Sequence, residues 1–333
     1  MKSKHLSRNT YSRNPNKNLR QKIFITGGCG FVGANFVKYL LDNGSYDITV
    51  YDNVSAGSKK NLDIAIKNSR QKGRCQFIEG DILDKRTLSK KVRKHDAIVH
   101  LAAHTQVLES IKSPQQGFDI NVAGTLHCLE AARENRIKKF IFASSNAVVG
   151  EQSIPINEEM IPEPLSPYGA SKVCGEALCS AYYSSYGIKT TSLRFANVYG
   201  AYSYHKTSVI TKFIKRIMNG QILTIYGTGK QTRDFIHADD ISLAISLALR
   251  SNQGGEVFQI GTGTETSVNK LITLLTTLLT NKKTKIIRTA AKKGEIVRNC
   301  SSIKKAQKIL RFTPMIDLEN GLSDIVKYFS TIS

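Results

Sequence analysis

The residues Thr26-Gly27-Gly28-Cys29-Gly30-Phe31-Val32-Gly33 are the strongest indication of the fold, because they join a short apolar run at residues 23–25 to a segment of helical periodicity at 31–41. An apolar run that stops at glycines is typical of a buried parallel strand. Glycines at such a turn let the backbone bend tightly and let a pyrophosphate approach the first N–H groups of the helix. The stretch therefore predicts a dinucleotide phosphate loop made by Gly27, Gly28, Gly30 and Gly33.

A carboxylate stands where such a loop needs one. A second apolar run, residues 48–52, ends at Asp52, nineteen residues after Gly33. A carboxylate at this position accepts hydrogen bonds from both ribose hydroxyls and repels a 2′-phosphate. The alternative is an unrelated surface Asp, but it does not explain why strand, loop, helix, strand and Asp follow in this order. The sequence therefore predicts NAD rather than NADP as cofactor.

Strand and helix patterns alternate through the first part of the chain. Further strands are expected at residues 75–78, 97–103, 139–145 and 191–196, with helical patterns between them. Such alternation predicts an α/β fold with a doubly wound parallel sheet of the Rossmann type and helices on both faces. We expect this NAD-binding domain to span residues 22–197, with residues 238–262 returning to it.

The remaining segments have other patterns. After Asn197 the alternation gives way to loops and short elements, with helices expected near residues 208–219, 304–310 and 318–329. We expect residues 198–237 and 263–333 to form a smaller C-terminal α/β cap that binds substrate. Residues 1–21 are rich in Ser, Asn, Lys and Arg, which predicts a disordered basic tail. An organelle transit peptide is the alternative, whereas a secretory signal would need an apolar stretch.

The charge balance is strongly basic. Among 333 residues there are 48 Lys and Arg against 26 Asp and Glu, a net charge of +22 at pH 7. Such a field attracts nucleic acid, anionic lipid or a phosphorylated small substrate. Because the basic residues are scattered along the chain and Trp is absent, we interpret them as a solvated surface. A nucleic-acid partner is therefore not expected.

Composition also argues against a metal site and a membrane span. The six cysteines show no C-x-x-C spacing and no neighbouring His cluster. We therefore expect no metal, and free thiols in the reducing cytoplasm. No apolar run reaches the roughly 18 residues that a membrane-spanning helix requires, so no membrane partner is expected.

A Tyr and a Lys supply a candidate proton acceptor. Tyr168 and Lys172 stand four residues apart after Ser166-Pro167, a typical helix start, and therefore share one helix face. An ammonium beside a phenol favours the phenolate and should lower its pKa from about 10 towards neutrality. A tyrosinate can take a proton from a sugar hydroxyl, with a Ser hydroxyl sharing it. A Tyr and a Lys four residues apart often mean only a solvated helix face. In a chain that also has a predicted NAD-binding loop, the same pair indicates a catalytic role.

From about residue 22 to residue 325 the chain resembles the extended short-chain dehydrogenase/reductase superfamily, in its nucleotide-sugar epimerase and dehydratase branch, and within it the UDP-glucose 4-epimerase type. The resemblance rests on the glycine loop, the Tyr168–Lys172 pair and four other motifs. These are His100-Leu101-Ala102-Ala103-His104, Arg194-Phe195-Ala196-Asn197-Val198-Tyr199-Gly200, Leu223-Thr224-Ile225-Tyr226-Gly227 and Gln231-Thr232-Arg233-Asp234-Phe235-Ile236-His237-Ala238-Asp239-Asp240.

The resemblance implies roles for individual residues. Tyr168 would be the base, Lys172 would tune it and also contact the cofactor, and Ser145 would be the hydroxyl partner. Asn197 and Arg233 would hold the nucleotide diphosphate, and Thr224 and Tyr226 would line the base. Further cofactor contacts would come from Phe31, Val32, Asn53, Asp81, Ile82, Ala102 and Ala103. The chain would form a homodimer, with helices within residues 114–134 and 168–186 at the interface.

Two positions after Ser145 select the reaction. The dehydratases of the family carry an Asp-Glu pair there, and its decarboxylases usually carry a Glu at the second position; this chain has Asn146 and Ala147. An amide and a methyl group cannot act as general acid and base. What remains suffices for 4-epimerisation, in which the sugar is transiently oxidised by NAD to a 4-keto form. Another nucleotide-sugar oxidoreductase, a decarboxylase, and a non-catalytic NAD-sensing or RNA-binding protein stay open as alternatives.

The resemblance also implies a position that controls the size of the sugar. In this family a residue five positions after the glycine of a Gly-Asp/Glu pair lies beside the sugar's 2-position. Counting from Gly294-Glu295 places Asn299 there. Asn is smaller than the Tyr that restricts some family members to plain hexoses. We therefore expect a UDP-hexose as substrate and expect 2-acetamido sugars to be accepted as well. UDP-glucuronate stays open as a further substrate. The alternative is that Asn299 faces solvent and does not contact the sugar.

Overall fold

A seven-stranded sheet forms the centre of the molecule. The computed structural model describes residues 20–279, 284–291 and 296–332. All neighbouring strands of this sheet are parallel, in the order β11-β6-β5-β4-β1-β2-β3. This confirms the predicted doubly wound α/β fold. The strands are β1 (Gln21–Thr26), β2 (Tyr46–Asp52), β3 (Cys75–Glu79), β4 (Ala97–His100), β5 (Lys139–Ser145), β6 (Lys189–Phe195) and β11 (Glu256–Ile260).

Two strand boundaries differ from expectation. Strand β1 begins at Gln21, which was assigned to the tail; the rest of that tail except Arg20 lies outside the described residues. Strand β4 ends at His100 rather than at residue 103, because its neighbour β1 ends at Thr26, the partner of His100 in the ladder. Beyond that point the chain leaves the sheet to form the wall of the glycine loop.

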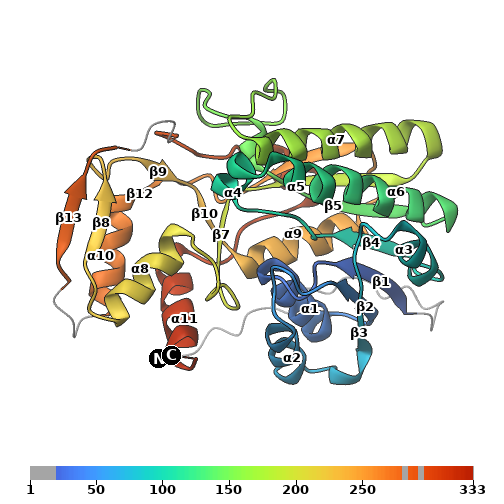
Figure 1. Ribbon diagram of the computed structural model, residues 1–333, viewed down its shortest axis with the longest axis horizontal. Helices are drawn as coiled ribbons and strands as arrows, with labels where there is room; N and C mark the ends of the chain where they lie inside the picture. Colours follow the sequence, from blue (N-terminus) through green and yellow to red (C-terminus); the bar gives the residue numbers. More distant parts are fainter. Residues whose placement is uncertain (1–19, 280–283, 292–295, 333) are drawn as a thin grey trace, which may run out of the picture.

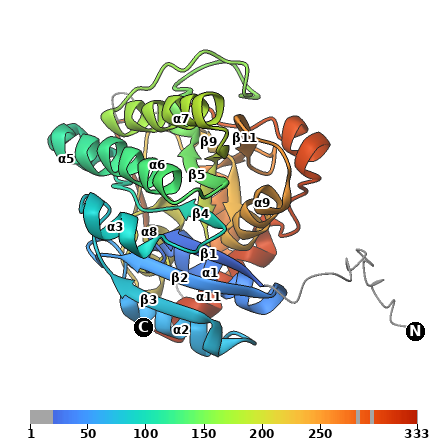
Figure 2. The same ribbon diagram turned by 90° about the vertical axis from the view of Figure 1, so that its right-hand side faces the viewer.

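Helices cover both faces of the sheet (Figures 1 and 2). Successive side chains of β1 alternate between the two cores, with Ile23 and Ile25 in one and Phe24 in the other. The first core is shared with α1 and α9, and the second with α3, α6 and α7. The helical elements of this part are α1 (Phe31–Asn43), α2 (Lys59–Lys67), η1 (Lys72–Arg74), α3 (Lys85–Lys91), α4 (Val107–Lys112), α5 (Pro114–Phe118), η2 (Asp119–Ala123), α6 (Gly124–Glu134), η3 (Asn146–Val148), α7 (Pro167–Tyr186) and α9 (Ala238–Arg250).

A smaller α/β layer lies beyond the carboxyl ends of the strands, at the left in Figure 1. Its helices α8, α10 and α11 pack around their own apolar core with β8. The expected helix at 304–310 is in part a π-helical turn. The elements are β7 (Asn197–Tyr199), α8 (Val209–Met218), β8 (Leu223–Tyr226), β9 (Thr232–Arg233), β10 (Phe235–His237), β12 (Thr266–Ser267), α10 (Val268–Leu278), β13 (Ile286–Thr289), η4 (Ala306–Leu310) and α11 (Leu318–Ser330).

The topology fixes where a ligand can bind. Strand order reverses between β1 and β4, so their following loops diverge at the carboxyl edge of the sheet. A crevice at such a switch point is where doubly wound folds bind their ligands. The chain enters the outer layer after β6 and returns through β11, which pairs with β6. The division into a domain of residues 22–197 plus 238–262 and a cap stays a prediction.

Candidate active site

The glycine loop between β1 and α1 leaves no room for larger residues. Gly27 has φ of +73°, and a Cβ there would lie 2.5 Å from the backbone nitrogen of Ala102. A Cβ on Gly33 would lie 2.2 Å from the carbonyl oxygen of Gly27, and one on Gly28 2.5 Å from the side chain of Val50. Each glycine therefore permits a close backbone approach, and together they bring the start of α1 onto the turn.

The amino end of α1 offers donors to an anion. Gly30 is its N-cap, no side chain caps the helix, and its first turn contains no acidic residue. The N–H groups of Phe31, Val32 and Gly33 therefore lack partners within the helix. Uncapped N–H groups and the positive end of the helix dipole suit a pyrophosphate. The loop thus fits the phosphates of a dinucleotide.

Asp52 is fixed beside this loop at the end of β2. Its Oδ2 accepts a hydrogen bond from the Cys29 N–H at 2.9 Å, and its Oδ1 accepts one from the Val54 N–H at 2.8 Å. Burial raises the pKa of Asp52, and the two backbone hydrogen bonds oppose that shift. Each oxygen retains acceptor capacity, so the carboxylate could receive the hydroxyls of a ribose.

The other residues expected at the cofactor lie in loops at the same edge of the sheet. Asn53 donates from Nδ2 to Oδ2 of Asp81 at 2.8 Å, which ties the loop after β2 to the loop after β3. Ile82 is buried next to Asp81. In the loop after β4, the backbone of Ala102 lies against Gly27, and Ala103 is the next residue in the chain. The fold therefore brings the expected cofactor residues to adjacent loops.

Ser145, Tyr168 and Lys172 meet where β5 and α7 converge. Ser166 caps α7 by accepting from the Gly169 N–H, and Pro167 occupies the first turn, so Tyr168 lies at the very start of the helix. The side chains of Tyr168 and Ser145 lie close enough for Ser145 to lower the pKa of the Tyr168 phenol. The Lys172 ammonium lies 5.9 Å from the centre of the Tyr168 ring and donates to the Ala143 carbonyl at 2.8 Å.

The pKa of Tyr168 is shifted in the direction opposite to our expectation. Burial raises the pKa of its phenol, and only the hydrogen bond with Ser145 lowers it. Burial lowers the pKa of Lys172 to about 8. The expectation that Lys172 by itself lowers the pKa of Tyr168 was wrong. The Lys172 ammonium donates to the Ala143 carbonyl and lies 4.8 Å from the centre of the Phe142 ring. Further positive charge is needed to favour the phenolate.

A buried ion pair supports this site and was not predicted. Glu176 accepts from Nε and Nη2 of Arg194, both at 2.8 Å, and also from Oγ of Ser144 at 2.5 Å. The two side chains are 8% and 4% exposed. The cluster joins α7 to β5 and β6. Glu176 lies one helical turn after Lys172, and Ser144 directly precedes Ser145. The position of Glu176 four residues after Lys172 is the signal that could have pointed to it.

A second network of polar groups lies below the glycine loop. His100 at the end of β4 contacts Oγ1 of Thr26 at 2.7 Å and Oγ1 of Thr125 at 3.0 Å through its two ring nitrogens. Complete burial lowers the pKa of His100 to about 3, so the ring is neutral. His100 therefore connects β1, β4 and α6 and is too deep for proton transfer to a substrate.

The residues expected at the substrate are more widely distributed. Asn197 begins β7, and its N–H donates to the Asp234 carbonyl at 2.9 Å. Arg233 donates from Nη1 to the carbonyls of Thr232 and Ile296 at 2.7 and 2.8 Å. Thr224 and Tyr226 lie on β8 in the outer layer. These four lie on three different strands, β7, β8 and β9, and do not form one compact cluster.

Asn299 lies near the catalytic strand. It is only 5% exposed, so the alternative that it faces solvent is wrong. Its Oδ1 lies 3.5 Å from Nδ2 of Asn146, which directly follows Ser145. Asn146 also donates to Oγ of Ser301 at 2.8 Å. The pair Gly294-Glu295, from which the position of Asn299 was counted, lies outside the described residues.

Comparisons with known proteins identify the family. The model of the NAD dependent epimerase/dehydratase family matches residues 23–261. The putative UDP-glucose 4-epimerase of Methanocaldococcus jannaschii is 38% identical over 92% of this chain and 97% of its own length. The chain belongs to the NAD dependent epimerase/dehydratase family, as its motifs led us to expect, and NAD is its cofactor.

Two solved structures resemble the fold closely. The UDP-N-acetylglucosamine 4-epimerase of Methanobrevibacter ruminantium M1, in complex with UDP-N-acetylmuramic acid, has a TM-score of 0.88 and 31% identity over 94% of this chain and 99% of its own. The UDP-glucuronic acid 4-epimerase of Bacillus cereus, in complex with UDP-glucuronic acid and NAD, has a TM-score of 0.87 and 32% identity over 94% and 100%.

Two further observations concern the described residues. No helix among them combines the length and apolar composition needed to cross a bilayer. In residues 20–279, 284–291 and 296–332, no three His, Cys, Asp or Glu side chains are grouped so that they could hold a metal ion.

Proposed function

We propose that the chain catalyses the 4-epimerisation of a UDP-sugar, with a 4-keto sugar as intermediate. The observation that carries this proposal is the convergence of Ser145, Tyr168 and Lys172 at the carboxyl edge of the sheet. Tyr168 takes the proton of the sugar's 4-hydroxyl and later returns it, while Ser145 shares that proton. Bound NAD supplies the hydride acceptor and donor. The positive charge of a bound nicotinamide would supply what Lys172 alone does not, and would favour the phenolate.

The site lacks the groups that a dehydratase would need. Asn146 uses its amide to hold Ser301 at 2.8 Å, and Ala147 carries no functional group. Water elimination requires a positioned acid and base beside the sugar. These two residues can supply neither, whereas epimerisation needs only the removal and return of one proton and one hydride. The alternative of a decarboxylase is disfavoured for the same reason.

The cofactor side is proposed to bind NAD in one orientation. The pyrophosphate would lie on the glycine loop and the amino end of α1, which lacks any cap of its own. The adenine ribose would bind to Asp52, whose carboxylate would repel the extra phosphate of NADP. Asn53, Asp81 and Ile82 would flank the adenine, and Ala102, Ala103 and Lys172 would flank the remainder of the cofactor.

The substrate side is proposed to bind UDP through the outer layer. Arg233 and Asn197 would hold the diphosphate, and Thr224 and Tyr226 would line the uracil. Asn299 would lie beside the sugar, because it is buried against Asn146 at the end of the catalytic strand. Its small amide would leave room for an acetamido group. We therefore propose that UDP-N-acetylhexosamines are accepted together with UDP-glucose and UDP-galactose.

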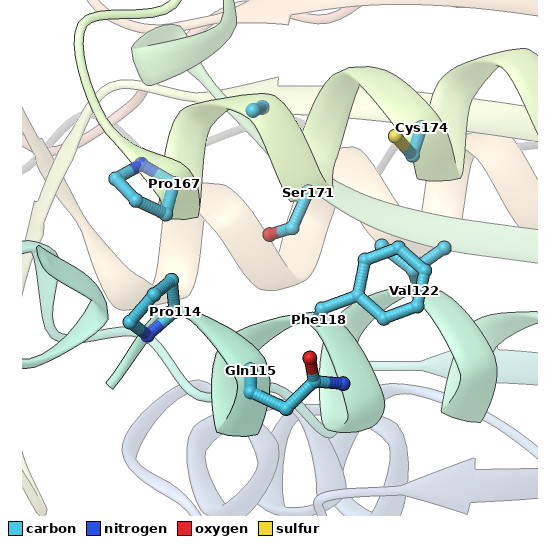
Figure 3. A pocket seen from close by; sticks show the side chains of 8 residues that line it. Pro114, Gln115, Phe118, Val122, Pro167, Ser171 and Cys174 are labelled. Carbon is cyan, nitrogen blue, oxygen red and sulfur yellow. The ribbon is translucent and has the colours of Figure 1, made fainter.

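A homodimer is proposed through the helices within residues 114–134 and 168–186, that is α5, η2, α6 and α7, with α4 beside them. Apolar side chains are exposed there, among them Leu108, Ile111 and Phe118 at 66%, 56% and 53%. Figure 3 shows the hollow of about 350 Å³ between α5 and α7, into which Phe118 and Pro167 project. An apolar face of this kind is typical of an interface. All six cysteines are free, which fits the cytoplasm as the proposed compartment.

The test is an assay with no added reductant. Purified protein is incubated separately with UDP-glucose, UDP-galactose, UDP-N-acetylglucosamine, UDP-N-acetylgalactosamine and UDP-glucuronate, and the products are separated by chromatography. We expect an isomer of unchanged mass from at least one 4-epimer pair, approached from both directions. Loss of water or carbon dioxide, seen as a lower product mass, would contradict the proposal.

A further inference from the structure

The edge of the sheet where the strands begin lies opposite the candidate active site. The outer layer lies at the carboxyl ends of the strands in Figure 1, and in Figure 2 the right-hand side of Figure 1, away from that layer, faces the viewer. Residues 20–22, 67–74, 90–96, 134–139 and 187–189 lead into β1, β3, β4, β5 and β6 respectively. These segments come from distant parts of the sequence, and the parallel sheet places them side by side along one edge.

Twelve exposed Lys and Arg side chains gather on these five segments. We call this set the basic edge: Arg20, Lys22, Lys67, Arg70, Lys72, Lys90, Lys91, Arg93, Lys94, Arg136, Lys138 and Lys189. All five segments lie within the described residues, and in them only Asp96 and Glu134 are exposed carboxylates. The basic edge is therefore a concentrated positive surface remote from the site that binds the nucleotides.

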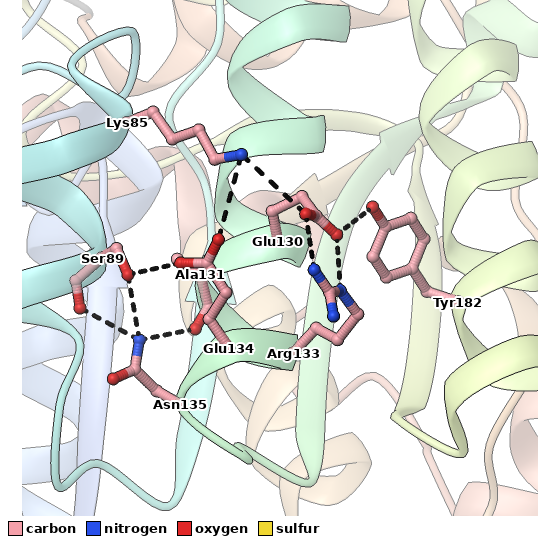
Figure 4. Close-up of polar contacts among 8 residues, drawn as sticks. All are labelled: Lys85, Ser89, Glu130, Ala131, Arg133, Glu134, Asn135 and Tyr182. Carbon is pink, nitrogen blue, oxygen red and sulfur yellow. Dashed lines mark hydrogen bonds and ion pairs between the residues drawn. The ribbon is translucent and has the colours of Figure 1, made fainter.

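The neighbouring carboxylates are already engaged by other groups. Figure 4 shows Glu130 accepting from Arg133 and Tyr182, and Glu134 accepting from Ser89 at 2.7 Å. Asp96 accepts the Lys22 N–H at 2.7 Å. Among the described residues, no carboxylate lies within ion-pair distance of any of the twelve basic side chains. Their charges are therefore available to a partner.

The dimensions of the basic edge suit a polyanion. Its segments border β6, β5, β4, β1 and β3, which lie in a row with β2 between the last two. Neighbouring strands are about 4.8 Å apart, so the row extends over about 24 Å. Phosphates along a nucleic-acid strand recur every ~3.4 Å, so about seven of them match this length.

The composition of the edge favours nucleic acid over a lipid surface. None of the large apolar side chains that the structure exposes lies in the five segments. Proteins that adhere to membranes usually add apolar residues to their basic ones, and this edge has none to insert. The chain also enters the edge at Arg20, after a stretch that in sequence holds five Lys and Arg and no Asp or Glu, residues 1–19.

We propose that the basic edge binds the phosphate backbone of nucleic acid without sequence preference. Exposed aromatic side chains for base stacking are absent from the five described segments, so the contacts would be electrostatic. From the sequence, a nucleic-acid partner was not expected, because the basic residues are scattered along the chain. They are scattered in sequence and gathered in space. Binding at this edge leaves the opposite edge free for UDP-sugars.

The experiment compares two triple variants of equal net charge. One, Lys72→Glu/Arg93→Glu/Lys138→Glu, reverses three charges along the basic edge. The matched control, Lys270→Glu/Lys285→Glu/Lys327→Glu, reverses three exposed lysines of the outer layer. Fluorescence anisotropy measures the binding of each full-length protein to a labelled 20-base RNA and a 20-base-pair DNA at several salt concentrations. Anionic vesicles of phosphatidylserine and phosphatidylcholine form the lipid arm.

We expect wild type to bind both nucleic acids at 100 mM salt and the edge variant to bind about tenfold or more weakly. For RNA, the slope of log affinity against log salt should fall by about 2, because each lost contact contributes ~0.7. The control variant should bind like wild type. Equal weakening of both variants, no binding by wild type, or tighter binding to vesicles than to nucleic acid would each overturn the proposal. UDP-sugar turnover of both variants checks their folding separately.

Discussion

The cofactor side and the substrate side of the crevice are assembled over very different distances in sequence. On the cofactor side, Asp52 binds the Cys29 N–H, only 23 residues away. On the substrate side, Asn146 binds Ser301 across 155 residues, and the Arg233 side chain binds the Ile296 carbonyl across 63. On the cofactor side, β1, the turn and α1 form the phosphate loop, and the loops that follow β2, β3 and β4 add Asp52, Asp81 and Ala102. The proposed substrate side depends on packing between the sheet and the outer layer.

The largest effect is expected where both sides meet, at Tyr168. Replacing Tyr168 by Phe removes the proton acceptor and leaves the ring in place. General acid and base groups contribute about 10²–10⁴-fold, so turnover should fall by that factor or more. Tyr183→Phe on the exposed face of the same helix is the control and should leave turnover unchanged. Near-normal activity of Tyr168→Phe would refute the proposed mechanism.

A large effect on stability is expected at the buried ion pair. Glu176→Gln leaves the Arg194 charge unpaired at a site where the arginine side chain is 4% exposed. Breaking such a pair typically costs about 3–5 kcal/mol of folding free energy. Urea unfolding of this variant should show that loss, whereas Glu134→Gln on the surface should change stability little. A loss below about 1 kcal/mol in Glu176→Gln would show that the pair is not structurally important.

The cofactor side is tested by Asp52→Ala. Loss of hydrogen bonds to a charged group costs about 1.5–3 kcal/mol, so NAD affinity should fall by about 10- to 100-fold. Affinity for NADP should fall less, because the variant also loses the repulsion of the 2′-phosphate. Calorimetric titration of wild type, Asp52→Ala and the control Asp47→Ala with both cofactors measures this. Equal affinity of wild type for NAD and NADP would argue against the proposed role.

The substrate side is tested by Asn299→Tyr. A bulky ring at this buried position should exclude an acetamido group, with a selective loss of about tenfold or more in kcat/KM for UDP-N-acetylhexosamines, equivalent to ~1.4 kcal/mol. Turnover of plain hexoses should be affected much less. Asn299→Ala controls for loss of the amide alone. If Asn299→Tyr loses both activities equally, or if wild type does not use acetamido sugars, the residue is not a size gate.

The smallest effect is a displacement of the pH profile. The hydrogen bond from Ser145 lowers the pKa of Tyr168, whereas burial raises it. Ser145→Ala removes the lowering effect, so the pKa of Tyr168 should rise further. Because the phenolate is the active form, the acidic limb of the kcat profile should move to higher pH. An unchanged or acid-shifted limb would indicate that Ser145 does not influence the ionisation of Tyr168.

Local patterns were sufficient to predict most of the sheet and the glycine loop. Alternation of apolar runs with helical periodicity located the parallel strands within a few residues, and the glycines marked the turn at Gly27. The end of β4 was missed because it depends on where β1 stops, which is a property of the pair. The direction of the Tyr168 pKa shift was missed because it depends on the burial of the phenol in the folded protein and on the Ala143 carbonyl to which Lys172 donates.

The remaining surprises were features of tertiary packing. Glu176 and Arg194 are separated by 18 residues and could each have been a surface charge. Burial of Asn299 depends on Asn146 and Ser301, which no local pattern connects to it. From the sequence, a site role was proposed for Asn299 but not for Glu176 or Ser301, because only the three-dimensional arrangement shows which side chains meet.

The late position of α9 in the sequence has a consequence for synthesis of the protein. Helix α9 covers the face of the sheet that α1 also covers, and Ile241, Ala244 and Ile245 pack in the same core as Ile23 and Ile25. A ribosome makes β1 and α1 more than 190 residues before α9. Until then, this face of the nascent sheet lacks the part of its cover that α9 provides, and apolar side chains stay accessible to chaperones. A fragment that stops at the end of β6 should therefore aggregate rather than fold alone.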